Sequence, residues 1–414
     1  MQPTLINKQH TATVPPWARP VTAGRIAGKT VTVKFSRAEK RRLRKRKKEP
    51  FSVYAEKHLH VTIGGHKGRW RNDVTPHAGQ IMDTYGQPWV RKVVFASNEQ
   101  DGKTAILNNL MQIIADVSPD LQMLMMPDQE SAEQVTRDRV KPLFEASARM
   151  RSLLTNKTDD LAKNRIKLNN GTLIYPVWAT SPSALASWPV PYLFGDEIDK
   201  MPLQVKKGAS PLGLFEKRQR QFPHKRKTYY SSTVESGVII DELNACDQIW
   251  IWQVTCPDCG ESFRLGLDHM TLPDGAMPEE IELHGGVEFS CECCGVSWSA
   301  AKLEAARRFG RWVCIKGADL KRPAKVGFHR RAFDCPAIPA SEIGSKYLQA
   351  EQDPGVAKKI EFTNSYLVEK YTSKQSERKV DIILNLRDEH HPRGLVPNDV
   401  ASLQLCVDTQ KDFF

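Results

Sequence analysis

Residues 90–117 place a Gly-Lys-Thr tripeptide between a strand pattern and a helix pattern, and no other part of the chain restricts the fold as strongly. The segment "VRKVVFA" at 90–96 is typical of a short buried strand, and "TAILNNLMQIIADV" at 104–117 has Ile, Leu and Met at helical spacing. A phosphate-binding loop (P-loop) needs this order, because backbone N–H groups and the positive end of the following helix face the anion. We therefore expect Gly102, Lys103 and Thr104 to begin a helix beside bound phosphate.

The same tripeptide occurs earlier, as Gly28-Lys29-Thr30. It lacks the required context, because "VPPWARP" before it cannot form a strand and the β-branched "VTVKF" after it does not favour a helix. We interpret it as a loop that enters a short strand. The second tripeptide departs from the usual G-x₄-G-K-[ST] pattern in one place, since Ser97 stands where the first Gly is expected.

The second tripeptide is the predicted phosphate loop, with Lys103 on the β- and γ-phosphates and the Thr104 hydroxyl on Mg²⁺. The sequence thus predicts an ATP site whose loop residues are Ser97, Asn98, Glu99, Gln100, Asp101, Gly102, Lys103 and Thr104.

A phosphate loop requires acidic partners at the end of a buried strand, and "VPYLFGDEIDKMP" at 190–202 provides them. Asp196 is the predicted Mg²⁺ partner, and Glu197 is the predicted general base that polarises the attacking water. Asp199 is a secondary neighbour. Taken alone, this motif is more often an acidic turn after an edge strand. Its occurrence together with the loop is what favours the catalytic interpretation.

A third strand end, "YYSSTVESG" at 229–237, carries Ser231, Ser232 and Thr233. A hydroxyl here could sense the γ-phosphate, although Ser and Thr at strand ends usually cap loops. Strands that alternate with helices through this region, including a hairpin at "NRIKLNNGTLIYPVWA", indicate an α/β fold with a mostly parallel sheet.

Four of the nine cysteines form two C-x₂-C pairs with 31 residues between them, in the knuckles "CPDCG" and "CECCG". Four thiolates in two knuckles match a tetrahedral, structural Zn²⁺ site and predict a zinc-ribbon-like β subdomain. The predicted ligands are Cys256, Cys259, Cys291 and Cys294, with Cys293 as an alternative. We interpret Cys246, Cys314, Cys335 and Cys406 as core residues.

The charge distribution is compatible with a polyanionic partner. The formal net charge is +12, and nine of the twelve residues in "RAEKRRLRKRKK" at 37–48 are basic. Such a run contacts nucleic acid, serves as an address, or is merely solvated, and the segment alone does not decide between these. No apolar run reaches the ~18–20 residues of a membrane span, and a secretory signal is not evident. We expect a soluble intracellular protein without a membrane partner.

The motifs in their order resemble the large terminase subunits of the phage lambda type, the GpA family of DNA-packaging motors. The resemblance covers about 51–414 and rests on "GRWRNDVTPHAGQIMD", "SNEQDGKT", "WATSPSALASWPVPYLFGDEID", "SSTVESG", the two cysteine knuckles and "CVDTQKD". It implies an ASCE-type ATPase that moves double-stranded DNA into procapsids in the bacterial host cytoplasm. It also implies a small terminase subunit, a portal protein and a homo-oligomeric active form as partners.

Carried over by residue, the resemblance places Lys103 and Thr104 in Walker A, Asp196 and Glu197 in Walker B, and Ser232 and Thr233 in the coupling motif. An aromatic residue is expected near an adenine-contacting segment, where this chain has His77, so Gln80 is only a candidate base contact. Arg139 is a candidate for the arginine that stabilises the transferring phosphoryl group.

The resemblance also makes Asp408 in "LQLCVDTQ" the first carboxylate of an RNase H-like nuclease. The sequence continues for only six residues, so we expect a truncated nuclease and do not predict DNA cleavage. The expected organisation is a basic arm (1–50), the ATPase domain (51–245), the zinc-ribbon-like subdomain (246–330), a linker or lid region (331–400) and the first nuclease strand (401–414).

Two other functions remain open at this point. The chain could be a non-catalytic, zinc-containing DNA-binding remnant of a prophage terminase. This alternative is favoured by Ser97 in place of Gly and by the short nuclease segment. A helicase shares the loop and the acidic pair, but no second motor domain is evident after residue 245.

Overall fold

The computed structural model describes residues 49–372, with gaps at 63, 65–66, 156, 158–159, 163 and 206–207, together with the backbone of two short strands before them. These strands, β1 (Arg25–Ile26) and β2 (Lys29–Thr30), pair antiparallel, so the first tripeptide contributes to a strand and does not begin a helix. The chain divides into two compact units, 1–49 and 50–414, and the main sheet with its helices belongs to the second. The basic run at 37–48 and Asp408 lie outside the described residues.

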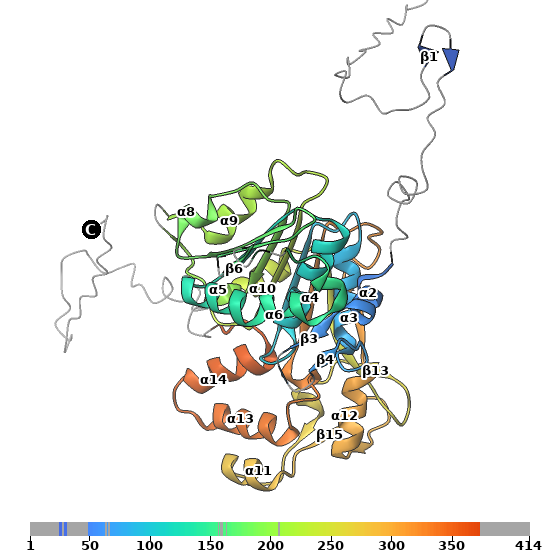
Figure 1. The fold of residues 1–414 in the computed structure, drawn as a ribbon. Helices are drawn as coiled ribbons and strands as arrows, with labels where there is room; N and C mark the ends of the chain where they lie inside the picture. Colours follow the sequence, from blue (N-terminus) through green and yellow to red (C-terminus); the bar gives the residue numbers. More distant parts are fainter. Residues whose placement is uncertain are drawn as a thin grey trace, which may run out of the picture. The chain divides into compact units, whose positions relative to one another are not determined.

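An 11-stranded sheet forms the centre of the second unit, in the order β13-β12-β18-β5-β11-β10-β6-β9-β8-β7 with β17 paired to β12 (Figure 1). Pairing is parallel from β12 through β9 and antiparallel at both ends of the sheet. Its strands are β5 (Lys92–Ser97), β6 (Leu121–Met126), β7 (Leu161–Ala162), β8 (Arg165–Lys167), β9 (Leu173–Trp178), β10 (Tyr192–Asp196), β11 (Lys227–Ser232), β12 (Gln248–Thr255), β13 (Ser262–Phe263), β17 (Arg311–Lys316) and β18 (Lys325–Arg330). The predicted mostly parallel α/β sheet is confirmed.

Helices cover both faces of this sheet, because its central strands are apolar on both sides. Val93 and Phe95 of β5 belong to one core cluster, and Val94 and Ala96 belong to the other. The first face is covered by α2 (Phe51–His58), α3 (Pro76–Gly86), α4 (Lys103–Val117), α6 (Lys141–Ala146) and α7 (Ala148–Arg151), and the second by α8 (Pro182–Leu185), α9 (Pro211–Glu216) and α10 (Val238–Asn244).

Short elements connect these layers and complete the large body. They are β3 (His60–Val61), β4 (Gly68–Arg69), α5 (Gln129–Val135), the π-helix η2 (Thr136–Val140) and the 3₁₀ turns η4 (Ile198–Lys200) and η6 (Lys217–Gln219). The helical stretch "SAEQVTRDRVKPLFEASARM" at 131–150 is divided among α5, η2, α6 and α7. The hairpin expected around Asn170-Gly171 forms from β8 and β9 as predicted.

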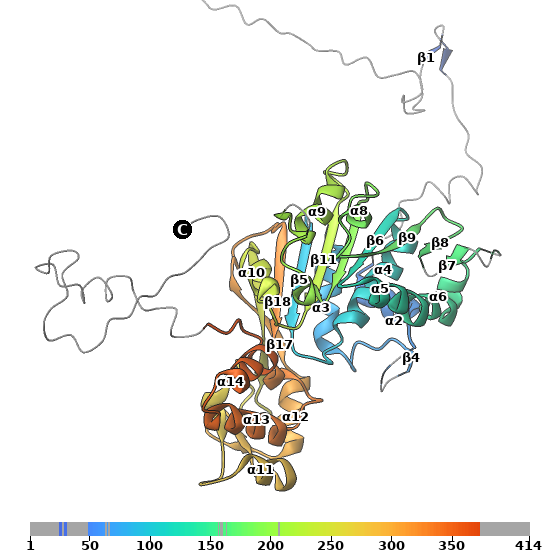
Figure 2. The same cartoon turned by 90° about the vertical axis from the view of Figure 1, so that its left-hand side faces the viewer.

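A small lobe, which we call the four-cysteine lobe, extends from one end of the sheet (Figure 2). It has its own apolar core, which includes Cys256, Cys291, Phe289 and Phe333. Its elements are η7 (Leu267–His269), β14 (Met270–Thr271), α11 (Pro278–His284), β15 (Glu288–Ser290), β16 (Ser297–Trp298), α12 (Ala300–Arg308), η8 (Ala332–Asp334), α13 (Ala340–Gln352), α14 (Ala357–Phe362) and the π-helix η9 (Thr363–Leu367).

The main sheet continues past residue 245. Strands β12, β17 and β18 all come from the range expected for the zinc-ribbon-like subdomain, and β18 pairs directly with β5 at the centre of the sheet. The boundary expected at 245 therefore cuts through the sheet, because a strand's place depends on distant backbone partners that local sequence patterns do not reveal. Most of the four-cysteine lobe is inserted between β12 and β17.

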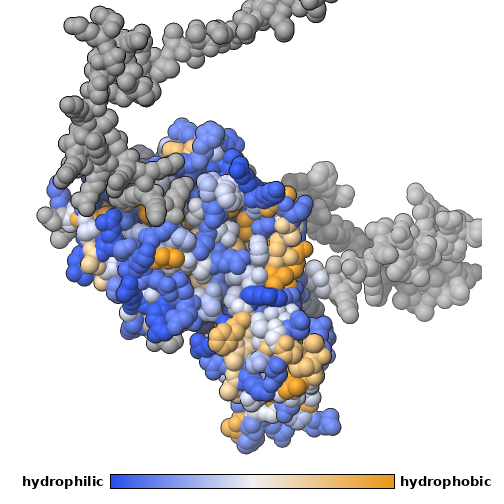
Figure 3. All heavy atoms as spheres, turned by 90° about the vertical axis from the view of Figure 1, so that its right-hand side faces the viewer, coloured by the Kyte–Doolittle hydropathy of each residue, from blue (hydrophilic) through white to orange (hydrophobic). Residues whose placement is uncertain are grey.

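Apolar exposure on this unit is unevenly distributed. Figure 3 shows a mainly hydrophilic large body and several apolar groups over the lower, four-cysteine lobe. Exposed large apolar residues of that lobe include Met277, Leu283, Val296 and Phe309. Within the described residues, no helix is both long enough and apolar enough to cross a membrane.

Candidate functional site

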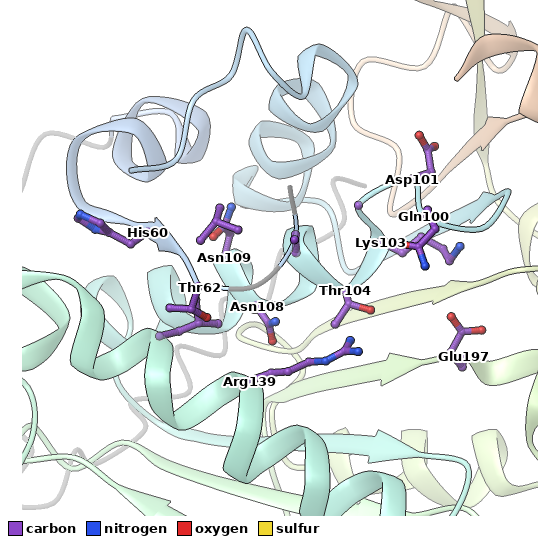
Figure 4. Close-up of a pocket in the computed structure, with 15 residues that line it drawn as sticks. His60, Thr62, Gln100, Asp101, Lys103, Thr104, Asn108, Asn109, Arg139 and Glu197 are labelled. Carbon is purple, nitrogen blue, oxygen red and sulfur yellow. The ribbon is translucent and has the colours of Figure 1, made fainter. Parts of the chain in front are cut away.

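A pocket of about 450 Å³ lies where β5 and β10 end, in front of α4 (Figure 4). The carboxyl ends of parallel strands meet at one edge, and this edge is where α/β proteins place ligands. The lining residues come from the predicted phosphate loop, from α4, η2 and α6, from the β3 region and from the end of β10. They are His60, Val61, Thr62, Gly64, Gln100, Asp101, Gly102, Lys103, Thr104, Ala105, Asn108, Asn109, Arg139, Leu143 and Glu197.

The phosphate loop turns sharply from β5 into α4. Gly102 stands at the N-cap with φ 78°, a left-handed conformation that favours glycine, and Gln100 also has a positive φ of 58°. Lys103 is the first residue of α4. The backbone therefore enters the helix in the strand–turn–helix order that the sequence predicts, with the N-terminal end of α4 at the pocket.

Lys103 is buried, and its ammonium lies inside the loop. Nζ donates to the carbonyl oxygen of Asn98 at 2.5 Å and to that of Ser97 at 3.4 Å. Burial lowers the pKa of this lysine, while Glu197 and Asp101 nearby act in the opposite direction. A buried cation among loop carbonyls is suited to contact an anionic ligand at this position.

Thr104 and Asp196 meet across the sheet edge. The Thr104 hydroxyl donates to Asp196 Oδ2 at 2.6 Å, and the Ser231 hydroxyl donates to Oδ1 at 2.8 Å. Asp196 is buried, and burial followed by the nearby charge of Glu197 raises its pKa. Hydroxyl and carboxylate oxygens are the protein ligands that Mg²⁺ prefers, so these two residues fit the predicted metal position.

Glu197 lines the pocket in an uncommon backbone conformation, with φ 51° and ψ 47°. A non-glycine residue in the left-handed region is strained, and such strain concentrates at functional sites. Its carboxylate accepts from the Thr233 hydroxyl at 3.2 Å and lies 3.4 Å from the Lys200 ammonium, both at Oε2. The strained backbone therefore aims this carboxylate into the pocket, where Figure 4 shows it beside the loop.

Asp199 does not line the pocket and instead organises the segment after β11. Its carboxylate accepts from the backbone N–H groups of Glu235 and Gly237 at 2.7 and 2.8 Å, and from that of Ile239. Its own N–H donates to the Ser232 hydroxyl at 3.1 Å. Each residue of Ser231-Ser232-Thr233 thus contacts a different residue of the acidic segment, which ties the end of β11 to the end of β10.

Arg139 extends from η2 into the pocket, toward Thr104 and Glu197 (Figure 4). It is exposed, and no described side chain pairs with its guanidinium. Gln80 lies on α3 and is not among the described residues that line the pocket. His60, Thr62, Asn108 and Asn109 do line it, and sequence reasoning missed them. Two adjacent asparagines in an otherwise apolar helix were an available signal.

A set of buried contacts anchors the phosphate loop from behind. The His77 ring, through Nε2, donates to the carbonyl oxygen of Asp101 at 3.0 Å, and the Arg330 guanidinium forms a buried ion pair with the Asp101 carboxylate. Burial and the nearby Arg330 charge lower the pKa of His77 to about 4, so the ring is neutral and its Nε2 carries the proton. His77 therefore holds the loop backbone and does not face the pocket.

The four predicted metal ligands come together in the four-cysteine lobe. The Sγ atoms of Cys256, Cys259, Cys291 and Cys294 all lie within 4.8 Å of one another. The turns after the two pairs contain Gly260 and Gly295 with φ 78° and 67°, as a tight knuckle requires. Cys293 is exposed and is not one of the four. Four clustered sulfurs match the donor set of a structural zinc site.

The family model described as "Phage terminase large subunit gpA, ATPase domain" matches residues 64–312. Similar solved structures include the large terminase ATPase domain of Thermus phage P74-26, at 11% identity and a TM-score of 0.40, and a mutant of that domain, at 11% and 0.39. Each alignment covers 74% of this chain and 95% of the other. No curated protein matches.

Proposed function

Because the chain belongs to the gpA family of phage terminase large subunits, we propose that it hydrolyses ATP at the pocket in front of α4 and uses this reaction to move double-stranded DNA. The observation that carries the proposal is the hydrogen bond between Thr104 and Asp196, beside Lys103 and Glu197. These four side chains come from two distant segments and have the chemistry that phosphoryl transfer requires.

In this proposal the backbone of residues 97–104 and the Lys103 ammonium bind the phosphates. Thr104 and Asp196 would hold Mg²⁺, which would supply positive charge to neutralise the phosphates. Glu197 accepts the proton of the attacking water, and Arg139 stabilises negative charge on the transferring group. His60 and Thr62 line the side of the pocket away from Glu197 (Figure 4). Together with Asn108 they are candidates to contact the nucleoside, a role that the resemblance suggested for Gln80.

In this proposal, the end of β11 couples hydrolysis of the γ-phosphate to movement of the DNA-binding surface. Ser231 contacts Asp196, and Thr233 contacts Glu197. A movement of either acid would therefore shift the segment after β11, to which Asp199 is hydrogen-bonded. The proposed coupling residues are Ser232 and Thr233. Double-stranded DNA, a small terminase subunit and a portal protein are the proposed partners, in a homo-oligomer in the host cytoplasm.

The four-cysteine lobe is proposed to hold a structural Zn²⁺ ion. The ligands would be Cys256, Cys259, Cys291 and Cys294, whose sulfurs leave no open position for catalysis. Phe289 and Trp298 pack in the same core, so the ion would stabilise the lobe rather than take part in hydrolysis.

The test compares ATP hydrolysis, with and without double-stranded DNA, by the wild-type chain and the Lys103→Ala and Lys29→Ala variants. The two substitutions are chemically identical and fall in the two copies of the same tripeptide. Lys103→Ala should reduce turnover by about 10²-fold or more, while Lys29→Ala should retain it. Equal activity of all three proteins would refute the assignment of the loop. DNA binding without any ATP binding would favour the non-catalytic remnant instead.

A further inference from the structure

Arg330 is one of the most deeply buried charged residues of the described chain, with 1% of its surface exposed. It ends β18, where its backbone is in register with Ser97 at the end of β5. One guanidinium nitrogen (Nη1) donates to Asp101, and the other (Nη2) donates to the carbonyl oxygen of Asp334. The guanidinium also lies over the Trp252 ring, 5.3 Å from its centroid. Three groups, the Asp101 carboxylate, the Asp334 carbonyl and the Trp252 ring, therefore determine where this side chain lies.

Asp101 is the phosphate-loop partner of this arginine, two residues before Lys103. It is 4% exposed. Its carboxylate lies between Arg330 and His77, with His77 Nε2 3.9 Å from Oδ1. Two contacts therefore hold the loop at Asp101. Arg330 of β18 forms an ion pair with its carboxylate, and His77 of α3 donates a hydrogen bond to its carbonyl oxygen. Neither His77 nor Arg330 is among the described residues that line the pocket, so both contacts reach the loop from outside the pocket.

The segment that carries Arg330 is itself fixed to the four-cysteine lobe. Arg331 donates to the carbonyl oxygen of Leu265, and the buried Arg307 of α12 donates to that of Phe333 at 2.8 Å. Ala332 and Phe333 belong to the same apolar core as Cys256 and Cys291. The position of Arg330 is therefore set jointly by the central sheet and by the base of this lobe.

We infer that Arg330 is a positioning residue for nucleotide binding: through Asp101 it holds the phosphate loop in its binding conformation and links the loop to the base of the four-cysteine lobe. This inference rests on the proposed ATP site. Backbone N–H groups bind phosphate only when the loop is preorganised, and a displacement of about 1 Å weakens such sites strongly. A guanidinium is suited to this role because its planar fork reaches two acceptors in fixed directions, which lysine does not do.

If Arg330 only stabilised the fold, its substitution would lower thermal stability without weakening nucleotide binding. Matched variants distinguish this role from positioning of the loop. Arg330→Lys and Asp101→Asn remove the fork or the charge with little change in volume. Arg331→Lys makes the same change one residue along, in a side chain that contacts the lobe but not the loop. In this variant the hydrogen bond from Arg307 to Phe333 and the packing of Phe333 in the lobe core still hold the segment in place. Each protein is titrated with the fluorescent nucleotide mant-ATP and Mg²⁺, and its thermal unfolding is followed by circular dichroism.

If Arg330 positions the loop, the Kd for mant-ATP rises about tenfold or more in Arg330→Lys and in Asp101→Asn, and stays unchanged in Arg331→Lys. The double variant Arg330→Lys/Asp101→Asn should bind no more weakly than the poorer single variant, because both changes remove the same contact. The Kd is measured below the unfolding transition of every protein.

Wild-type affinity in folded Arg330→Lys and Asp101→Asn would overturn the inference, whatever their thermal stability. So would equal weakening in Arg331→Lys, or fully additive losses in the double variant. If Arg330→Lys does not fold, Asp101→Asn, which changes only the loop side of the contact, decides alone. A wild-type chain that does not bind mant-ATP would refute the proposed function itself, and this outcome is distinct from all the others.

Discussion

The Thr104 hydroxyl donates a hydrogen bond of 2.6 Å to Asp196, although 92 residues separate the two in sequence. Thr104 is the second residue of α4, just after the turn of the phosphate loop, and Asp196 ends β10. Because β11 lies between β5 and β10 in the sheet, the two residues approach over the end of β11, where Ser231 completes the contact at 2.8 Å. A hydroxyl and a carboxylate held together at a helix N-terminus are the arrangement that the proposed divalent-cation site beside phosphate requires.

Glu197→Gln should abolish ATP turnover and preserve ATP binding. The amide keeps the size of the carboxylate and one acceptor oxygen but does not accept a proton from water, and the expected loss in kcat is about 10²- to 10⁴-fold. Glu235→Gln is a suitable control, since Glu235 is exposed on the segment after β11. Turnover is measured by phosphate release and binding by mant-ATP fluorescence. Retained turnover in Glu197→Gln would exclude this residue as the base.

Asp196→Asn should stabilise the nucleotide-free protein while it removes hydrolysis. Burial raises the pKa of Asp196 in the folded state, so its ionised form at neutral pH opposes folding. A raised folded pKa means that stability is highest below the unfolded pKa and is lost as pH rises through the folded pKa. The gain from the substitution should therefore be largest at neutral pH and shrink as the pH is lowered toward 4.

Urea unfolding of wild-type and Asp196→Asn protein at pH 7.5 and about pH 5 measures this gain. Asp319→Asn, which neutralises an exposed carboxylate, should leave stability unchanged. A loss of stability in Asp196→Asn at neutral pH would show that its hydrogen bonds to Thr104 and Ser231 outweigh the cost of burying the charge.

Acid should destabilise the chain through two buried histidines. Burial lowers the pKa of His77 to about 4 and that of His329 to about 3. Since an unfolded histidine titrates near 6.5, stability is complete above that pH and falls as the pH drops toward the folded pKa values. Each histidine should contribute a slope of about 1.4 kcal/mol per pH unit in the range between about 6 and 4.

His77→Gln should lower the slope of stability against pH by the contribution of one histidine. Substitution of the exposed His224 by Gln should leave the slope unchanged. Each variant is compared with the wild type and not judged by its own slope. This is necessary because the raised pKa values of the buried Asp196 and Asp334 make the protein more stable as the pH falls, opposite to the histidines. Unfolding free energies at several pH values give the slopes. Identical slopes for wild type and His77→Gln would contradict a neutral, buried His77.

Cys259→Ser should remove bound zinc, and Cys293→Ser should not. Both residues are exposed cysteines in knuckles, but only Cys259 belongs to the four-sulfur cluster. We expect about one zinc per chain in the wild type and in Cys293→Ser, and loss of the metal with unfolding of the four-cysteine lobe in Cys259→Ser. Elemental analysis and proteolysis of the lobe measure this. Loss of zinc in Cys293→Ser would assign the ligands differently.

The local parts of the site could be predicted from the sequence because their geometry depends on neighbouring residues. A strand, a glycine turn and an apolar-periodic helix follow each other in "VVFASNEQDGKTAIL", and the structure places Gly102 at the N-cap with the required positive φ. The two cysteine knuckles are equally local. A hydrogen bond between residues 92 positions apart has no local sequence signature. The acidic motif could be assigned to the loop only because phosphoryl transfer requires an acidic partner.

Sequence patterns by themselves determined the alternating α/β character, the second Gly-Lys-Thr as the one before a helix, and the pairing of cysteines into knuckles. Only the tertiary structure decided that β18 lies beside β5, that His60 and Thr62 line the pocket while Gln80 does not, and that Arg330 reaches Asp101. The physical reason is range: dihedral preferences and hydrophobic periodicity act over a few residues, whereas sheet order and buried ion pairs depend on how distant segments pack.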